Sequence, residues 1–207
     1  MLTISNLSCD RGDRQLFSGV SFSISAGEWL HLSGDNGVGK TSLLRLICGL
    51  GAHTDGHIAW GSDVPQAGPA SRSDLREHLI YLGHQLALKD DLSALENLMT
   101  HAAVAGQALS HERAFTALAE LGLRGRENLP VKVLSQGQKR RAALARLLTS
   151  DASLWVLDEP FVALDTHAQA VLTTVMNAHL TRGGMVLLTS HQAVELSGQG
   201  HVYRLAA

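Results

Sequence analysis

The chain has 207 residues, of which 45% are hydrophobic, and a formal net charge of −2. This length allows one domain with a sizeable core. The charge balance argues against binding to nucleic acid or to an anionic lipid surface, since both usually require a basic excess. The amino-terminal residues do not have the pattern of a signal peptide, and no apolar run approaches the roughly 20 residues that span a bilayer. We therefore expect a soluble chain that reaches a membrane only by docking to another protein.

Alternation of apolar and polar residues predicts that the chain begins with short strands. The alternation covers residues 2–7 and 20–24 and has the period of a half-buried sheet. An apolar run over 28–33 then enters a glycine-rich loop, and the apolar spacing after it predicts a helix over 41–48. Strand, loop and helix thus follow one another directly.

The next segment contains a turn, a loop and a short strand. A Thr-Asp-Gly sequence at 54–56 predicts a turn that closes a hairpin onto a strand over 57–60. Residues 61–74 are rich in Gly, Pro, Ser and Asp, which predicts an exposed loop, and the apolar run 79–82 predicts a short buried strand.

Helical periodicity then extends over 93–121. Ser93 and Glu96 have the spacing of a capping box, and Gly122 marks the expected end of this helix. A further helix is expected over 136–148.

The last third of the chain alternates strand and helix. An apolar run over 153–158 ends in acid, as in a strand buried on both faces of a parallel sheet, and a helix over 166–180 and a strand over 185–189 follow. This alternation predicts an α/β fold, a parallel sheet covered by helices, with a helical insertion over about 84–148.

A phosphate-binding loop is predicted between the strand at 28–33 and the helix that follows. Residues 34–41 read Gly-Asp-Asn-Gly-Val-Gly-Lys-Thr and match the P-loop pattern GxxxxGK[ST]. Glycines let successive N–H groups converge on phosphate oxygens, and the next helix adds its positive N-terminal end. Lys40 is expected to reach the β- and γ-phosphates of ATP, and the Thr41 hydroxyl to bind Mg²⁺. The expected nucleotide contacts are Gly34, Asp35, Asn36, Gly37, Val38, Gly39, Lys40, Thr41 and Ser42.

The strand at 153–158 supplies the acidic half of the predicted site. It delivers Asp158 to its carboxyl end, where a carboxylate can hold Mg²⁺ directly or through water. Glu159 follows and is placed to orient or deprotonate the water that attacks the γ-phosphate. Together with the P-loop, these two residues predict a P-loop NTPase that hydrolyses its nucleotide.

Four more motifs follow in a fixed order. They are Leu-Gly-His-Gln at 82–85, Leu-Ser-Gln-Gly-Gln at 134–138, Ala-Leu-Asp at 163–165 and Leu-Thr-Ser-His-Gln at 188–192. With the P-loop and the acidic strand, they make nearly the whole chain resemble the ABC transporter ATPases. In that family the four motifs are the Q-loop, the signature, the D-loop and the segment of the switch histidine.

The resemblance implies a fold and a set of roles. The fold is a single ABC ATPase domain over 1–207, with an antiparallel β subdomain, a mostly parallel core sheet and the helical subdomain. In addition to Lys40 and Glu159, the residues implied in ATP hydrolysis are Gln85 and His191. Gln85 is implied as a further ligand of Mg²⁺, beside Thr41 and Asp158, and as a sensor of the membrane subunit.

The signature implies a dimer. Ser135 is a natural N-cap for the helix that follows, and Gly137 lets a backbone amide approach an anion. Because the P-loop already binds phosphate within its own chain, a second anion-binding helix end implies another role. The resemblance implies that this helix end contacts the ATP held by a second copy. The residues implied at this contact are Ser135, Gly137, Gln138 and Asp165.

Two positions depart from the family pattern. Gln136 stands where the signature usually has glycine, and a side chain there is compatible with activity if it points outward. Arg11 stands where the family usually has an aromatic residue that stacks on adenine. A guanidinium plane can also stack on a base, and a solvated arginine is the alternative, so loose base selectivity is expected.

Within the family, residues 81–85, 92–98, 136 and 189–192 are similar to those of the haem exporters used in cytochrome c maturation. That likeness implies a homodimer on the cytoplasmic face of the bacterial inner membrane, where ATP-driven closure of the dimer powers integral membrane subunits. It implies no direct contact with haem and none with nucleic acid. The alternatives are an ABC ATPase for a lipid, drug or metal, a soluble P-loop ATPase that acts on ribosomes or DNA, and a small-molecule kinase, which would not need Ser135.

Overall fold

The computed structural model describes residues 1–12, 14–61 and 75–206. These residues divide into two compact units. The first unit comprises Met1–Gly83, Ala152–Pro160 and Asn177–Ala207, and the second comprises His84–Asp151 and Phe161–Met176. The loop expected over 61–74 lies, from residue 62 onward, outside the described residues.

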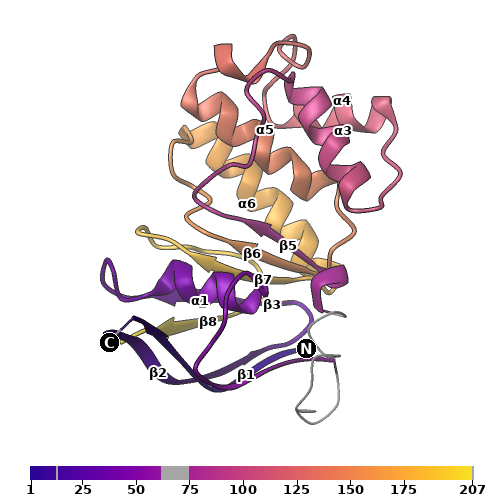
Figure 1. The fold of residues 1–207 in the computed structure, drawn as a ribbon. Coiled ribbons are helices and arrows are strands. Elements are labelled where there is room, and N and C mark those ends of the chain that lie inside the picture. The colour runs from indigo at the N-terminus through magenta and orange to yellow at the C-terminus, as the bar shows by residue number, and fades with distance from the viewer. Residues whose placement is uncertain (13, 62–74, 207) are drawn as a thin grey trace. The chain divides into compact units, whose positions relative to one another are not determined.

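The first unit contains an antiparallel sheet of three strands in the order β2-β1-β4 (Figure 1). The strands are β1 (Leu2–Arg11), β2 (Arg14–Ile24) and β4 (Asp55–Trp60). Residues 2–7 and 20–24 therefore do lie in strands, although both strands are longer than expected. The hairpin expected at 54–56 was wrong, because β4 pairs with β1. Gly56 is required there for another reason, since a Cβ at this position would overlap the backbone of Asn6.

A parallel sheet of five strands forms the second layer of this unit, with the order β5-β6-β7-β3-β8. The strands are β3 (Glu28–Ser33), β5 (Leu79–Leu82), β6 (Leu154–Leu157), β7 (Met185–Thr189) and β8 (Gln199–Arg204). Every residue of β6 and β7 is buried, which explains their uninterrupted apolar sequences. The expected α/β fold, with an antiparallel sheet and a parallel core sheet, is confirmed. Strand β8 was not expected.

Helix α1 (Lys40–Ile47) packs in the core that the two sheets of the first unit share. Its buried face consists of Leu43, Leu44, Leu46 and Ile47, which recur at helical spacing. Figure 1 shows α1 between the strands of the antiparallel sheet and those of the parallel sheet. The end of β3 and the start of α1 are thereby fixed relative to the sheets, and the loop between them carries the predicted phosphate-binding residues.

The second unit contains helices α3 (Ala94–Val104), α4 (His111–Glu120) and α5 (Gln136–Thr149), which pack on one another, and the short helix η1 (Val131–Val133). Helix α6 (Thr166–Thr181) begins in this unit and ends in the first. The capping box of Ser93 and Glu96 is present, but the single helix expected over 93–121 was wrong. The chain turns at Gly106, which has a φ of 70°, and Ser110 caps the next helix. Among the described residues, no helix is long and apolar enough to cross a membrane.

A stacked pair of rings lies in the core of the first unit. The rings of Trp155 and His179 have centroids 3.8 Å apart and planes 10° apart. A Cβ at Gly184 would overlap the imidazole of His179, so this glycine makes room for the ring. Only 5% of His179 is exposed. Burial, as the main cause, lowers the pKa of His179 from 6.5 to about 4.

Acid is therefore expected to weaken this core through His179. Since the pKa is lower in the folded than in the unfolded chain, the unfolded chain binds the proton more tightly, and stability falls as the pH drops from 6.5 towards 4. This group alone is expected to reduce the free energy of unfolding by about 2 kcal/mol between pH 7 and pH 5. The His179→Phe variant keeps a stacked ring without the titration. Urea unfolding of both proteins at the two pH values checks this, and an equal loss in both would contradict it.

Candidate active site

The predicted P-loop lies around the N-terminus of α1. Its N-cap, Gly39, has a φ of 108°, and a Cβ there would come within 3.0 Å of the Phe17 ring, so only glycine fits this position. Glycine provides no side-chain cap for α1, whereas α3, α4 and α5 all begin with a serine whose hydroxyl accepts a backbone N–H. The N-terminal N–H groups of α1 are thus presented to a ligand, which fits the phosphates of a nucleotide.

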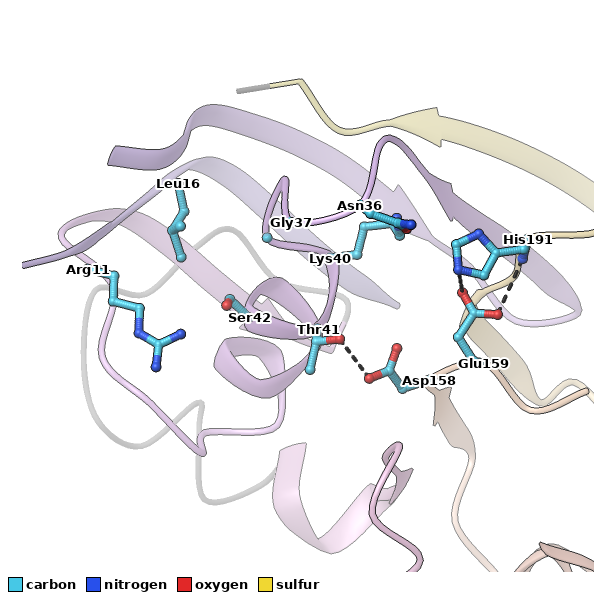
Figure 2. Close-up of a pocket in the computed structure, with 11 residues that line it drawn as sticks. Arg11, Leu16, Asn36, Gly37, Lys40, Thr41, Ser42, Asp158, Glu159 and His191 are labelled. Atoms are coloured by element: carbon cyan, nitrogen blue, oxygen red, sulfur yellow. Dashed lines mark hydrogen bonds and ion pairs between the residues drawn. The ribbon is translucent and has the colours of Figure 1, made fainter. Parts of the chain in front are cut away.

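The ammonium group of Lys40 lies over the same loop. Its Nζ donates to the carbonyl oxygen of Gly34 at 2.6 Å and to that of Asp35 at 3.1 Å. Gly34 has a φ of 140°, and a Cβ on it would come within 2.6 Å of the Leu205 carbonyl oxygen. The loop therefore packs closely against the backbone of Leu205. Its lysine extends over the turn, as Figure 2 shows.

The Asp158 carboxylate is held by two threonine hydroxyls. Thr41 Oγ1 donates to Asp158 Oδ2 at 2.8 Å, and Thr189 Oγ1 donates to Asp158 Oδ1 at 2.8 Å. Asp158 is 3% exposed. Burial, and after it the charge of Asp158, raises the pKa of Tyr81 to about 12, so this phenol stays neutral beside the carboxylate. The paired oxygens of Thr41 and Asp158 are the hard ligands that Mg²⁺ prefers.

Glu159 lies next to His191. The His191 backbone N–H donates to Glu159 Oε2 at 3.3 Å, and the Nε2 atom of the ring is 3.5 Å from Oε1. Glu159 has a φ of 52°, in the left-handed region that residues with a side chain rarely adopt. Strained backbone of this kind is concentrated at functional sites. Figure 2 shows the Glu159 carboxylate turned towards His191.

An open cavity of about 280 Å³ lies between the P-loop and the two acidic residues Asp158 and Glu159. Figure 2 shows Arg11 and Leu16 on one side of the start of α1, and Glu159 and His191 on the other. The cavity thus has one end with Lys40, Asp158 and Glu159, suited to phosphates paired with a metal ion, and an end where a base could lie against Arg11 and Leu16. Its lining residues are Arg11, Leu16, Asn36, Gly37, Gly39, Lys40, Thr41, Ser42, Asp158, Glu159 and His191.

Three of the expected nucleotide contacts do not line the cavity. Gly34 and Asp35 offer the carbonyl groups that accept from Lys40. The side chain of Val38 is buried in the hydrophobic core, and its backbone N–H donates to the Asp35 carbonyl oxygen at 3.4 Å. Val38 could contact a nucleotide only through its backbone.

The remaining predicted residues belong to the second unit. Gln85 is exposed in the loop that precedes α3, two residues before Ala87, which has a φ of 51°. His101 Nε2 lies 2.9 Å from the Ala87 carbonyl oxygen and fixes this turn. Burial, followed by the charge of Arg146, lowers the pKa of His101, which favours the neutral ring.

The expected cap of α5 is a full capping box. Gln138 N donates to Ser135 Oγ at 3.3 Å, and Ser135 N donates to Gln138 Oε1 at 2.9 Å. Gly137 is needed for close packing, since a Cβ there would come within 2.8 Å of the Ala163 carbonyl oxygen. Gln136 is exposed. The side chain that departs from the family pattern therefore points outward.

Asp165 caps the following helix. Its Oδ1 accepts the Ala168 backbone N–H at 2.8 Å at the start of α6. Ala163, two residues earlier, has a φ of 62° and provides the carbonyl against which Gly137 packs. The predicted signature and D-loop thus meet within one unit.

Two residues of the site were not predicted. Leu16 lines the cavity beside Arg11, and Thr189 bonds to Asp158 and Glu159, the two acidic residues that follow β6. Leu16 could have been found from the alternation of β2. Thr189 lies within the 188–192 motif, but its contact depends on the pairing of β6 with β7, which the sequence does not specify.

Comparison with known proteins gives consistent matches. The family model for ABC transporters matches residues 17–162. A cytochrome c biogenesis ATP-binding export protein CcmA from Nitrosomonas europaea is 49% identical over 95% of this chain and 91% of its own length. The protein of the same name from Methylococcus capsulatus is 44% identical over 95% of this chain and 94% of its own length.

Solved structures share the fold. An ABC transporter ATP-binding protein from Pyrococcus furiosus superposes with a TM-score of 0.83 at 24% identity, over 99% of this chain and 96% of that chain. A further ATP-binding cassette, solved as a dimer bound to ADP and Pi, superposes with a TM-score of 0.80 at 23% identity, over 93% of this chain and 88% of that chain.

Proposed function

Since the chain belongs to the ABC transporter family, we propose that it is the ATP-hydrolysing subunit of an exporter complex that acts in cytochrome c biogenesis. The observation that carries the proposal is the meeting of Thr41 and Lys40 of the P-loop with Asp158 and Glu159 in one cavity. The role in cytochrome c biogenesis is supported by relatives of that name at 44% to 49% identity over nearly the whole chain.

The residues that line the cavity have different roles in ATP hydrolysis. Lys40 and the N-terminal N–H groups of α1 bind the phosphates of ATP. Glu159 accepts a proton at its carboxylate from the attacking water, and His191 holds that carboxylate in place. Asn36, Gly37, Gly39 and Ser42 complete the phosphate contacts, and Arg11 lies against the base.

Mg²⁺ is the proposed cofactor. Thr41 and Asp158 would hold it, with Gln85 as a further ligand implied by the family pattern. Their oxygen atoms fit this ion. Bound Mg²⁺ supplies positive charge beside the phosphate oxygens.

The working form is proposed to be a homodimer. Ser135, Gly137, Gln138 and Asp165 would contact the ATP held by the second copy. This is supported by the similar cassette that was solved as a dimer. A two-fold axis would give two equivalent sites, each formed by both chains.

We further propose that residues 1–207 form one domain, with 84–148 as its helical subdomain. This is supported by the second compact unit, His84–Asp151 together with Phe161–Met176, which contains the proposed subdomain. The dimer would lie at the cytoplasmic face of the bacterial inner membrane, docked to integral membrane subunits, with no direct contact with haem or nucleic acid. The export function in the relatives' name supports a membrane partner.

The test is a pull-down from detergent-solubilised membranes with the Glu159→Gln variant, which should retain ATP. Lys40→Ala, which should not bind ATP tightly, is the matched control. We expect multi-span proteins and haem absorbance in the Glu159→Gln eluate and less of both with Lys40→Ala. If the eluate contained multi-span proteins but no haem, the proposed role in cytochrome c biogenesis would be wrong. If neither variant retained any membrane protein, the exporter proposal would be wrong.

A further inference from the structure

We propose that Thr189 is a positioning residue for ATP hydrolysis, whose one hydroxyl group fixes the Asp158 carboxylate and the Glu159 backbone together. Thr189 is the last residue of β7, and the two acidic residues follow the neighbouring strand β6. The inference rests on the proposed ATPase function and adds to it a residue that does not line the cavity.

The directions of the two hydrogen bonds are fixed by chemistry. Glu159 N–H can only donate, so the hydroxyl oxygen of Thr189 accepts from it, at 2.9 Å. The hydroxyl proton is then given to Asp158 Oδ1, at 2.8 Å, because an ionised carboxylate can only accept. The Thr189 hydroxyl thus donates one hydrogen bond to Asp158 and accepts one from the next residue, Glu159.

The two contacts set the direction of both carboxylates. Thr189 binds Asp158 Oδ1 and Thr41 binds Oδ2, so the plane of the carboxylate is held from both sides. The Glu159 backbone is in the left-handed region, with a φ of 52°, and its N–H bond to Thr189 holds this uncommon conformation.

Solvent cannot replace this hydroxyl. Thr189 is 0% exposed, so the bonds broken by its removal would not be replaced by bonds to bulk water. The Thr189→Val variant has nearly the same shape and lacks only the hydroxyl. It is therefore expected to remove the bonds to Asp158 Oδ1 and to the Glu159 N–H, while Thr41 keeps its bond to Asp158 Oδ2, without leaving a cavity.

The first measurement is steady-state hydrolysis. Thr189→Val is expected to lower kcat about 10- to 100-fold, the usual effect of losing a group that orients a metal ligand. KM for ATP should change by no more than about 3-fold, because the P-loop contacts remain. Thr189→Ser keeps the hydroxyl and should restore kcat to within about 3-fold of wild type.

The second measurement does not depend on turnover. Binding of a fluorescent ATP analogue is titrated with and without Mg²⁺. Thr189→Val should bind the analogue normally without Mg²⁺ and need about 10-fold more Mg²⁺ to reach the Mg²⁺-bound state. If Thr189 had a merely structural role, Thr189→Val would lower the affinity for the analogue equally with and without Mg²⁺.

The matched control is Thr149→Val, which removes another buried threonine hydroxyl, one that bonds to backbone carbonyls within α5. It should leave kcat unchanged. Equal kcat values for Thr189→Val and wild type, or an equal loss in Thr149→Val, would overturn the inference. A wild-type protein without hydrolysis would contradict the proposed function instead, and the Mg²⁺ titration would then still decide the role of Thr189.

Discussion

The Glu159→Gln variant is expected to bind ATP as tightly as the wild type and to hydrolyse it about 10²- to 10⁴-fold more slowly. The amide has the shape of the carboxylate but cannot accept a proton from water. It can still accept the His191 backbone N–H, which lies 3.3 Å from Oε2, so the local structure should persist. Phosphate release measures turnover, and equilibrium binding of a fluorescent nucleotide measures affinity.

Glu195→Gln is the matched control for Glu159→Gln. It makes the same change of charge at an exposed position of the first unit, outside the lining of the cavity. Its turnover should equal that of the wild type. In size-exclusion chromatography with ATP and Mg²⁺, Glu159→Gln should elute as a dimer, because ATP is bound but not consumed. A monomer at saturating nucleotide, or a turnover close to that of the wild type, would refute the role of Glu159.

The Ser135→Arg variant is expected to lower turnover by about 10²-fold or more, the scale of losing a donor that contacts the reacting phosphate. The capping box at the start of α5 would be replaced by a long cationic side chain, which would also block a second copy. Ser110→Arg is the control, since the Ser110 hydroxyl also accepts a backbone N–H at a helix start, that of α4, and Ser110 is also exposed. Both variants should lose about 1 kcal/mol of stability, and only Ser135→Arg should lose hydrolysis.

A mixing experiment tests whether the site is shared between two chains. Lys40→Ala and Ser135→Arg should each be inactive alone. Mixed in equal amounts they should regain about a quarter of wild-type turnover, since half of the dimers are mixed and each mixed dimer has one intact site. No recovery would contradict the shared site. A small-molecule kinase would behave differently again, because it would keep its activity in Ser135→Arg.

The parts of the site that follow from consecutive residues could be predicted. The P-loop is a local pattern, and its glycines at positive φ and its Lys40 lie as that pattern requires. Asp158 and Glu159 were found because an apolar run ends in them. The capping box at Ser93 and the N-cap at Ser135 depend on residues close in the sequence, and both are present.

The parts that depend on distant pairing could not be predicted. The Thr189 hydroxyl bonds to Asp158, which is 31 positions away in the sequence. Only the pairing of β6 with β7 brings these two residues together. The hairpin predicted at 54–56 was wrong because a turn signal does not specify which strand β4 pairs with, and β4 pairs with β1. Strand β8 was missed because most of its residues are exposed, so it has no apolar pattern. The helix over 93–121 was drawn too long because the apolar spacing continues across the break at Gly106.

The place of β7 in the sheet also limits when the nascent chain can acquire its nucleotide site. Strands β3 and β6, which precede the P-loop and Asp158, each pair with β7 and not with one another. Until the ribosome has added Met185–Thr189, no strand holds the two halves of the site at their final spacing. ATP bound together with Mg²⁺ is therefore not expected to protect a shorter translation intermediate from proteases, and this protection should begin only once the strand has left the exit tunnel.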